Sequence, residues 1–485
     1  MKINKKSLFE YFEDKKTKSK FIYEIDTKKK KNFYNIVKTV YELKTNYNFK
    51  KKRVICILPN CISYIEFFFA ITSSGGVFVP LPYFTEKNEL KKILKFIKPN
   101  MIVSDGNKDL SFFKKKIINV NKISNKKVYK NKLSNNELKD LACIYYSSGT
   151  TGNPKGIMYS HENMIALIES INKDFKFGPK DRHLTFLPFG HTASINYNIL
   201  PSLMTGSELF ISKGFDKIGV NFFNILQEYK ITYTQIVPSV LFILNKMNIN
   251  IGKKKFNNLK FIGCGSSFLP LSKQIEFIQK YKIKVANLYG LSETGPTHID
   301  DPRKKNWRPG TIGKPLSVCK FKLDKKNNIL IKGKNVFIGY YKNKKLFEKS
   351  FVNKKWFITG DIGKKEKGKI FFLDRSKDLI IKNGINIVPG EIEEAIYKSK
   401  KILECCVVGI DDEIQGEEIA VAIKPNNSNL SFNLLVDFIK KQCKQSLSNY
   451  KVPKHFYLLD NFPKTASGKI KRRLIRKRLN LVYNK

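Results

Sequence analysis

A loop rich in glycine and hydroxyl residues follows an apolar run in the first third of the chain. It extends from Ser147 to Gly156 and reads Ser-Ser-Gly-Thr-Thr-Gly-Asn-Pro-Lys-Gly. Glycines let backbone N–H groups turn toward an anion, the hydroxyls add donors or a metal ligand, and Lys155 supplies a positive charge. We therefore expect this loop to hold phosphate. It is not the common P-loop, because Pro154 and Gly156 stand where that motif needs Gly and Ser or Thr.

Further segments place a ring, carboxylates and basic groups in an order that suits a nucleotide. A ring can stack on the base, and an acid can hold the Mg²⁺ that accompanies polyphosphate. A carboxylate after glycine in a tight turn can accept hydrogen bonds from ribose hydroxyls. The segments are Tyr289-Gly290-Leu291-Ser292-Glu293, expected on a loop at a strand end, Thr359-Gly360-Asp361, Asp374-Arg375 with Asp378 to Gly384, and Pro463 to Ile470, expected to be an exposed loop.

The elements that must position these residues follow from the apolar pattern. From Arg53 to Tyr289, short apolar runs alternate with segments of helical period, which predicts α/β layers with a largely parallel sheet. The phosphate loop would lie at the carboxyl end of a strand over 142–146, the edge where open sheets bind ligands. Beyond Gly310 the pattern predicts a β-rich subdomain, and from Asp378 a compact α+β unit.

The composition is ordinary except for its charge. The chain has 485 residues, of which 42% are hydrophobic and 27% charged, with a formal net charge of +50. Such a charge would suit a protein that binds nucleic acid or an anionic membrane surface. The basic residues recur along the whole length and form no single face or tail, so we favour solvated lysines and keep that binding function as the alternative of another class. The positive electrostatic field of the protein would still attract ATP.

Cysteine usage and hydropathy indicate the compartment. The 8 cysteines show no C-x-x-C and no paired spacing with the 5 histidines, so neither a metal cage nor a disulfide framework is expected. Residues 1–12 lack the apolar core of a signal peptide, and the most apolar stretch, 64–79, is too short and broken to span a bilayer. We expect a cytoplasmic protein without a transmembrane segment.

Taken together and in this order, the five motifs resemble the adenylate-forming (AMP-binding) superfamily, which contains acyl-CoA synthetases, aryl-CoA ligases, luciferases and peptide-synthetase adenylation domains. The resemblance covers the chain from about Val54 to Arg473. It implies a large N-terminal domain over 1–374 and a small mobile α+β C-terminal domain over 375–485, joined at a hinge near Lys377. It also implies two steps: ATP and a carboxylate give an acyl-adenylate and pyrophosphate, and a thiol then attacks the acyl-adenylate.

The resemblance also implies a role for each matching residue. The catalytic residues would be Lys469, Glu293 and Thr150. The ATP-binding residues would be Ser147, Ser148, Gly149, Thr151, Gly152, Lys155, Gly265, Tyr289, Ser292, Asp361, Arg375 and Lys377. Glu293 and Thr151 would hold Mg²⁺, and the acid would contact His191, Gly263 and Gly290.

Individual functions within these sets follow from the same resemblance. Tyr289 would stack on adenine, and Asp361 and Arg375 would contact the ribose. Lys469 would bind the carboxylate and the bridging oxygen during adenylation. In the second step the lysine would withdraw by rotation about the hinge.

Two positions depart from the family's pattern. Ser292 stands where threonine is more usual, and it keeps the hydroxyl. Gly190 stands where a second aromatic residue often precedes the histidine of the acyl-site motif, so the acyl tunnel is expected to differ in shape. For His191, a substrate or gating role is favoured over that of an ordinary buried histidine.

The acyl-site motif also bears on the substrate. Residues 189–194 contain no acid to pair with an α-amine, and an unpaired buried ammonium would be costly. Wall segments implied by the resemblance, 237–244, 263–267 and Leu291, are apolar or small. We therefore expect a fatty or aryl carboxylic acid and not an amino acid.

The acceptor is inferred from the C-terminal part. Residues 389–393 and 416–417 resemble CoA ligases and no carrier domain is attached, so CoA is expected, with a separate acyl carrier protein as the alternative. The basic tail from Lys471 to Arg478 is expected to be a solvated helix face.

Overall fold

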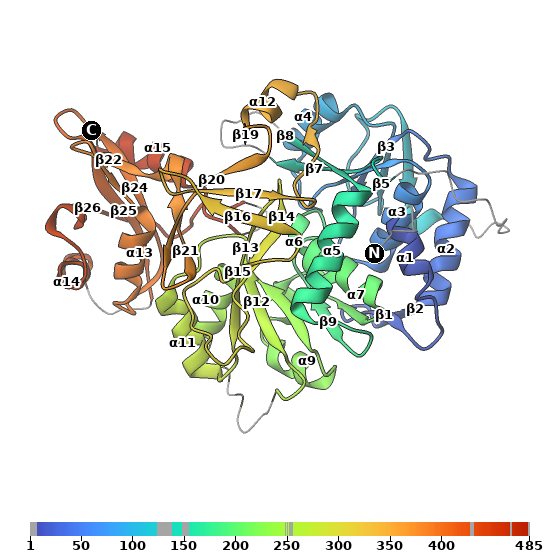
Figure 1. The fold of residues 1–485 in the computed structure, drawn as a ribbon, viewed down its shortest axis with the longest axis horizontal. Coiled ribbons are helices and arrows are strands. Elements are labelled where there is room, and N and C mark those ends of the chain that lie inside the picture. Colours follow the sequence, from blue (N-terminus) through green and yellow to red (C-terminus); the bar gives the residue numbers. More distant parts are fainter. Residues whose placement is uncertain are drawn as a thin grey trace.

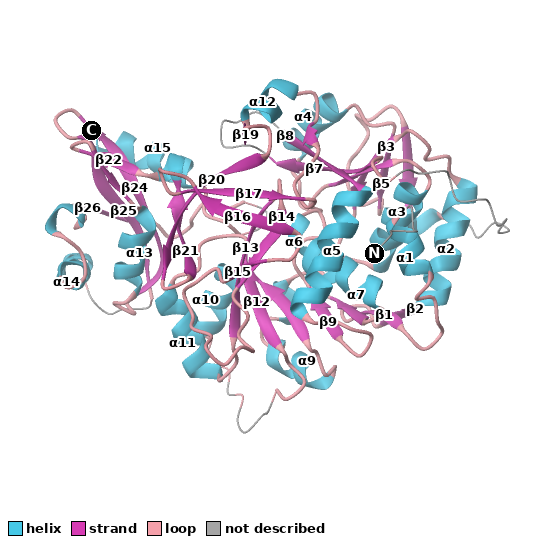
Figure 2. Cartoon of the chain, viewed as in Figure 1, coloured by secondary structure: helices cyan, strands magenta, loops and turns pink. Residues whose placement is uncertain are grey.

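The structure is a computed structural model, and it describes residues 7–123, 138–147, 155–247, 249, 251, 256–426, 431–465 and 468–483. Two large sheets with their helices make up most of the chain, and a smaller α+β unit lies at one end of the molecule (Figure 1). Helices and strands alternate through the large part (Figure 2). This architecture confirms the predicted α/β class. No helix in the described ranges is long and apolar enough to cross a membrane.

The first large sheet has seven strands and is mostly parallel. Strands β7, β4, β3, β5 and β6 are parallel, whereas β8 and β18 pair antiparallel at one edge. In spatial order the strands are β18 (Gly339–Tyr340), β8 (Lys155–Ser160), β7 (Leu141–Ser147), β4 (Val77–Pro80), β3 (Arg53–Ile57), β5 (Met101–Ser104) and β6 (Lys116–Asn119). The predicted strand before the phosphate loop is therefore present as β7.

Helices pack on this sheet according to their apolar pattern. α4 (Lys87–Ile97) buries Leu90, Ile93 and Ile97 and exposes its lysines. α3 (Ile62–Ser73) is buried around its circumference, because it contacts β3 and β4 of the first sheet and β1 of the second. α1 (Leu8–Glu13) and α2 (Phe33–Asn46) cover its outer side. α3 thus joins the two sheets into one core.

The second large sheet has nine strands, and its central strands are parallel. In spatial order they are β15 (Lys314–Pro315), β14 (Gly295–Ile299), β13 (Val285–Leu291), β12 (Phe261–Gly265), β11 (Tyr233–Ile236), β9 (Arg182–Thr185), β10 (Glu208–Ile211), β1 (Phe21–Glu24) and β2 (Lys29–Asn32). Gly265 ends β12, and Ser292 and Glu293 follow β13. Predicted site residues therefore share the carboxyl edge of this sheet.

Helices of this part complete its layers. They are α5 (His161–Phe175), α6 (Thr192–Ser194), the π-helix η2 (Ile195–Ile199), α7 (Leu200–Thr205), α8 (Phe215–Ile218), α9 (Phe222–Glu228), α10 (Pro238–Lys246) and α11 (Leu271–Tyr281). α5 begins at Ser160, whose side chain accepts from the Asn163 amide. η2 contacts β9, β11 and β14 and so covers one face of the sheet directly after the acyl-site motif.

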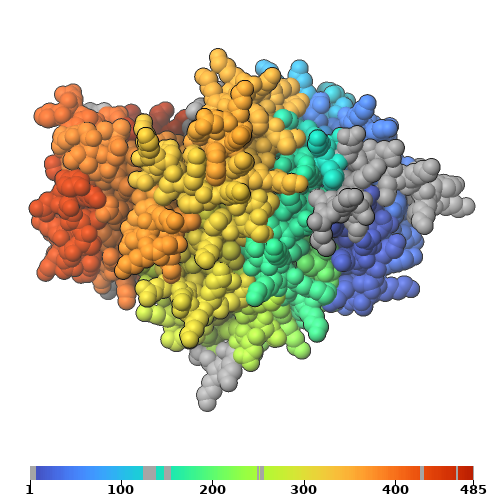
Figure 3. All heavy atoms as spheres, viewed as in Figure 1, coloured from blue at the N-terminus to red at the C-terminus, as the bar shows by residue number. Residues whose placement is uncertain are grey.

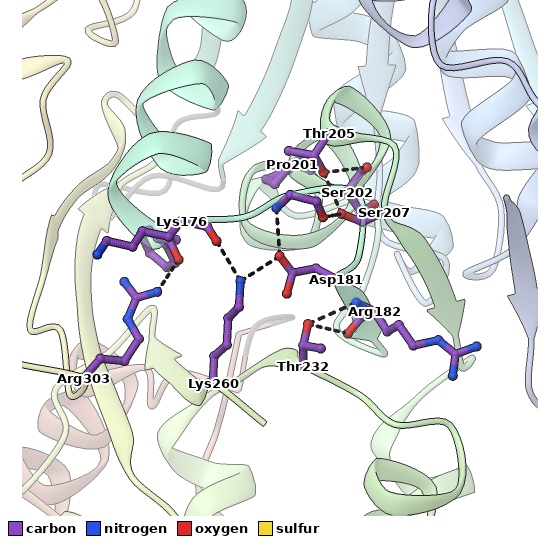
Figure 4. A network of polar contacts seen from close by, with 12 residues as sticks. Lys176, Asp181, Arg182, Pro201, Ser202, Thr205, Ser207, Thr232, Lys260 and Arg303 are labelled. Carbon is purple, nitrogen blue, oxygen red and sulfur yellow. Dashed lines mark hydrogen bonds and ion pairs between the residues drawn. The ribbon is translucent and has the colours of Figure 1, made fainter. Parts of the chain in front are cut away.

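A network of polar contacts ties together the amino ends of these strands (Figure 4). Lys260, just before β12, donates to Asp181 Oδ2 at 2.8 Å and to the Lys176 carbonyl at 2.7 Å. Asp181 precedes β9, and Thr232, which precedes β11, accepts from the Arg182 amide at 3.0 Å. The network lies at the opposite end of the strands from the predicted site. It fixes their relative stagger without occupying the ligand edge.

A smaller antiparallel sheet follows, as the β-rich texture predicted. Its strands are β16 (Cys319–Leu323), β17 (Asn328–Gly333), β20 (Trp356–Glu366) and β19 (Phe351–Val352), with β21 (Lys369–Arg375) paired to β20. The helix α12 (Lys344–Lys349) precedes β19. Asp361 on β20 and Arg375 on β21 are register partners. The ribose-binding pair predicted from separate motifs is thus adjacent in one ladder.

The C-terminal unit is the predicted compact α+β arrangement. Its strands are β23 (Ile385–Ile387), β22 (Ile380–Lys382), β25 (Gly416–Pro425) and β24 (Ile402–Asp412), with β26 (His455–Leu458) parallel to β25. Alternate residues of β24 enter two cores: Val407 packs with α13 (Pro389–Tyr397) and α14 (Phe432–Lys444), and Val408 packs with α15 (Arg472–Tyr483). The unit forms one end of the space-filled molecule, against segments coloured yellow to orange (Figure 3).

Candidate active site

A ring and a carboxylate meet where β13 approaches β20. The Tyr289 hydroxyl donates to Asp361 Oδ2 at 2.8 Å. Asp361 lies inside β20 and not in the expected tight turn, because Gly360 adopts a φ of 72° and the strand continues beyond it. Tyr289 and Gly290 likewise lie inside β13, and the expected loop begins only at Ser292. Both motifs are therefore held by paired strands, with a register shift between Tyr289 and Gly290, and paired strands fix them more rigidly than loops.

The second oxygen of Asp361 makes an ion pair but no hydrogen bond. Asp361 Oδ1 is buried and has no hydrogen-bond partner among the described residues, and Arg375 Nε lies 3.5 Å away. Burial raises the pKa of Asp361, and the positive charge of Arg375 opposes that shift. A buried acceptor that makes no hydrogen bond is destabilising, and the ion pair with Arg375 offsets part of that cost. A ribose hydroxyl is a donor of the right kind, so the pair fits a nucleoside.

Cationic groups gather around this carboxylate. Burial is the main cause that lowers the pKa of Lys377, and the nearby charges of Arg375 and Lys155 lower it further. Burial followed by the charge of Arg375 lowers the pKa of Lys469 to about 8. Groups of like charge disfavour one another's charged form only at short range. Holding these positive charges close together is electrostatically unfavourable. The negative charge of a bound polyphosphate would neutralise them.

Tyr340 links the metal-binding candidate to the phosphate-loop lysine. Its hydroxyl donates to Glu293 Oε1 at 2.9 Å, and Lys155 Nζ lies 5.4 Å from its ring centroid. Phe337 N also donates to the Glu293 carbonyl, at 2.9 Å. Sequence reasoning missed Tyr340, because a tyrosine in a short strand carries no motif of its own. Its position places Glu293 and Lys155 close to one another.

The donor set fits Mg²⁺ that arrives with a nucleotide. No group of three or more His, Cys, Asp or Glu side chains within the described part of the chain could hold a metal ion by itself. Mg²⁺ is usually held by one or two carboxylates together with substrate phosphates. Glu293 offers one carboxylate beside Lys155, so the residues present fit a metal brought by ATP better than a resident ion.

Part of the predicted phosphate loop lies outside the described residues. This applies to Ser148, Gly149, Thr150, Thr151 and Gly152, whose roles stay predictions. For Ser147, only the backbone at the end of β7 is described.

The acyl-site candidates are placed by close packing. His191 caps α6 by accepting from the Ala193 amide at 3.3 Å, and burial lowers its pKa to about 4, so the imidazole is neutral at pH 7. A side-chain carbon at Gly263 would lie 2.6 Å from Leu288 Cδ1, and one at Gly290 would overlap the next strand. Gly265 is restricted in the same way by the Leu288 carbonyl, at 2.6 Å. These glycines let the strands pack, and their contact with substrate stays a prediction.

Gly190 explains one departure from the family's pattern. A Cβ at this position would overlap the backbone of Leu81 and Pro82, just beyond β4. The chain after β4 therefore occupies the space that an aromatic side chain would need. At Gly190 the acyl-site motif packs directly against the first sheet.

Lys469 is brought to this site from the C-terminal unit. The neighbouring Gly468 has a φ of 78°, and a Cβ there would lie 2.8 Å from Ser239 Oγ of α10. Its loop is therefore docked and partly buried, which corrects the expectation of an exposed loop. A cavity of about 100 Å³ separates the two parts beside Lys469, with Phe242, Phe268 and Arg375 among its lining residues.

Arg472 corrects a second expectation. It lies at the start of the tail predicted to be a solvated helix face, yet its guanidinium is largely buried and bonds Glu393 at 2.6 Å. Glu393 and Asp374 were also not singled out as site residues. One signal was available: an arginine three residues after the candidate lysine, in a chain that mostly uses lysine.

A buried carboxylate, a ring and cations from separate elements lie together in an arrangement that suits a nucleoside polyphosphate. The fold and the site thus fit the class of nucleotide-using proteins.

Comparisons with known proteins carry this further. Residues 46–341 match the model of the AMP-binding enzyme family, and residues 391–469 match that of the AMP-binding enzyme C-terminal domain. The 2-succinylbenzoate–CoA ligase of Listeria innocua is 32% identical over 345 residues, which is 70% of this chain and 71% of that protein. The sulfoacetate–CoA ligase of Cupriavidus necator is 28% identical over 342 residues, covering 68% and 66%.

The fold agrees with a solved structure. ATP-bound MatB from Rhodopseudomonas palustris superimposes with a TM-score of 0.89 at 22% identity, covering 98% of this chain and 99% of that one. The chain belongs to the AMP-binding enzyme family, as the order of its motifs predicted. The expected enzyme class, an acid–thiol ligase, agrees with these relatives.

The packing of Gly190 generates a stability prediction. Gly190→Ala should destabilise the protein by about 1–3 kcal/mol, because the added methyl must displace the backbone of residues 81–82. Urea unfolding followed by tryptophan fluorescence measures the effect. Gly178→Ala is the matched control, since nothing lies within 4 Å of a Cβ there. Equal stability of the two variants would contradict the packing argument.

Proposed function

We propose that this protein is an AMP-forming ligase that joins a carboxylic acid to CoA. The observation that carries the proposal is the convergence of Lys469 from the C-terminal unit with Asp361 and Arg375 of the β-rich sheet. A site assembled from two parts of the chain suits a reaction in which one cation is needed for only one of two steps.

The first step is the attack of the carboxylate oxygen on the α-phosphorus of ATP. The bond from the α-phosphorus to the bridging oxygen breaks, and pyrophosphate leaves with the electron pair. Charge repulsion between carboxylate and phosphate opposes this attack. Lys469 would bind both oxygens, while Asp361 and Arg375 orient the ribose and Lys155 balances the leaving charge. Mg²⁺ supplies further charge neutralisation at the phosphates.

The second step is thioester formation. The thiol of CoA, having released its proton to solvent, attacks the acyl carbon, and the bond to the AMP oxygen breaks with AMP as leaving group. We place the domain boundary between residues 374 and 375 and the hinge at Lys377, which lies in the short 3₁₀ helix η3 (Ser376–Asp378). Rotation there would withdraw Lys469 between the steps.

The substrate is a fatty or aryl acid without an α-amino group. His191 is neutral at pH 7, and its motif offers no carboxylate to pair an ammonium. The curated relatives act on 2-succinylbenzoate and sulfoacetate, which have no amino group. CoA is favoured as the thiol because both relatives are CoA ligases, and a separate acyl carrier protein is the alternative acceptor.

The location proposed is the cytoplasm. All 8 cysteines are unpaired, which suits a reducing compartment.

The proposal predicts pyrophosphate release that depends on an acid. The protein with ATP and Mg²⁺ should release pyrophosphate when supplied with one or more of short, medium, long, aryl or dicarboxylic acids, and not with amino acids alone. An enzyme-coupled pyrophosphate assay measures it, and CoA thioester is followed by mass spectrometry. Absence of acid-dependent release across the panel would overturn the proposal.

Lys469→Ala separates the two steps. Adenylation should fall by about a hundredfold to a thousandfold, because a charge that acts only at the attacked phosphate is lost. Thioester formation from a preformed acyl-adenylate should stay close to the wild-type rate. Lys471→Ala, at an exposed position two residues away, is the control for the substitution itself. Loss of both steps in Lys469→Ala would contradict the assigned role.

The lowered pKa of Lys469 gives a pH dependence. With a pKa of about 8, the amine is charged below pH 8 and neutral above it, so kcat/KM for adenylation should fall as the pH rises through 8. Lys469→Arg keeps its positive charge over this pH range. Its kcat/KM should therefore show no fall above pH 8, whatever its absolute rate. Stopped-time assays between pH 6.5 and about 9.5 measure both profiles. A wild-type profile that stays flat in this range would contradict the assignment.

A further inference from the structure

The loop that carries Lys469 is closed by its own hydrogen bonds. Thr465 N donates to the Lys469 carbonyl at 2.7 Å, and Lys469 N donates to Thr465 Oγ1 at 3.2 Å. Lys464 and Ile470 form an antiparallel bridge, and Lys471 N donates to the Pro463 carbonyl at 2.8 Å. The loop therefore leaves and rejoins the C-terminal unit at adjacent points. Its orientation depends on what holds those two points.

The outgoing arm is held by Arg472. Its Nη1 and Nη2 donate to the two oxygens of Glu393 at 2.6 and 3.0 Å, and Nη1 also donates to the Val407 carbonyl at 2.6 Å. Glu393 accepts in addition from the Val407 amide at 2.9 Å. The two-pronged geometry fixes both the position and the plane of the guanidinium. Because Arg472 is three residues from Lys469, this contact sets where the lysine's backbone emerges.

The incoming arm is held by a second ion pair. Lys464 Nζ pairs with Glu404 on β24, the strand that also supplies Val407. The Lys464 side chain is 31% exposed and the Glu404 side chain 13%, whereas Glu393 is 7% exposed. Exposed pairs contribute little, and buried two-pronged pairs are costly to break. Of the two contacts, the one between Arg472 and Glu393 therefore dominates.

The same network reaches the nucleotide side of the site. Arg472 Nη2 lies 3.9 Å from Asp374 Oδ2. Asp374 accepts from the amides of Gly390, at 3.0 Å, and Arg375, at 2.8 Å. Arg375 in turn lies beside Asp361. The arm of the Lys469 loop and the ribose-binding pair thus share one buried frame.

We propose that Arg472 and Glu393 are positioning residues for adenylation: they hold the loop so that Lys469 points at the carboxylate and phosphate. The Lys464–Glu404 pair supports the same loop more weakly. This inference rests on the proposed function, because it concerns the step in which Lys469 acts. Neither Arg472 nor Glu393 needs to touch a substrate. A misplacement of about 1 Å is enough to cost about a hundredfold in rate.

The chain offers a matched control on the same helix. Arg476, one turn further along α15, bonds Asp411 at 2.7 Å and Glu417 at 2.6 Å. It also pairs with carboxylates of the C-terminal unit, but it is four residues from Arg472 and does not hold the loop. Arg476→Lys makes the same substitution at a more exposed pair on the same helix and leaves the loop base intact.

The kinetic test compares Arg472→Lys with Arg476→Lys. Arg472→Lys keeps the charge and loses the two-pronged contact, so kcat for adenylation should fall about tenfold to a hundredfold. KM for ATP and thioester formation from preformed acyl-adenylate should stay close to wild type, whereas the thermal midpoint should fall, because a buried contact is lost. In a double-mutant cycle with Glu393→Gln, the effects of the two substitutions on kcat should not add, because both substitutions break the same Arg472–Glu393 contact. Arg476→Lys should leave adenylation unchanged.

A measurement that needs no turnover keeps this inference separate from the proposed function. Lys469 in the free protein is labelled with limiting acetic anhydride at fixed pH and quantified by mass spectrometry. The labelling rate of Lys469 should change at least severalfold in Arg472→Lys and stay as in wild type in Arg476→Lys. If no acid supports adenylation, the proposed function fails, and labelling still decides the positioning role.

Two results would overturn the inference. One is an Arg472→Lys protein in which both Lys469 labelling and adenylation match wild type. The other is a parallel loss of adenylation and thioester formation, which would mean that Arg472 only stabilises the C-terminal unit.

Discussion

The burial of several cations close to one another and to the buried Asp361 carboxylate is the constraint that shapes this site. Lys469, Arg375, Lys377 and Lys155 come from different elements, yet burial and one another's charge depress the lysine pKa values that resolve a shift. Asp361 compensates only part of this charge, and its own pKa is raised by burial. The protein holds the cluster together through tertiary structure, so a polyanion is the ligand that relieves it.

The fold supplies the rigidity that such a cluster needs. Asp361 and Arg375 lie on paired strands, Tyr289 lies within β13 of the nine-stranded sheet, and Lys155 begins a strand of the other large sheet. The polar network at the opposite strand ends fixes the stagger of that nine-stranded sheet. Lys469 lies beyond the hinge proposed at Lys377, and its loop touches α10 through Gly468. One movable cation among fixed ones suits a reaction whose two steps need different charge.

Much of this could be predicted from the sequence. Alternating apolar runs gave the α/β layers, and the order of the motifs gave the family, because each motif encodes local chemistry. What could not be read were the contacts between distant segments. Tyr340 bridges Glu293 and Lys155, and Arg472 is buried on Glu393, although neither residue lies in a diagnostic pattern. Gly360 was expected in a tight turn but lies within β20 with a φ of 72°. The sequence could not show this, because the strand forms only by pairing with distant segments.

The central claim is that a polyphosphate is the missing counterion of this cluster. The most direct test is the pKa of Lys469 itself, obtained from the pH dependence of its acetylation in the free protein and with saturating ATP and Mg²⁺. The account predicts a pKa of about 8 in the free protein and a clear rise when the nucleotide is bound. A pKa that does not change on binding would contradict it.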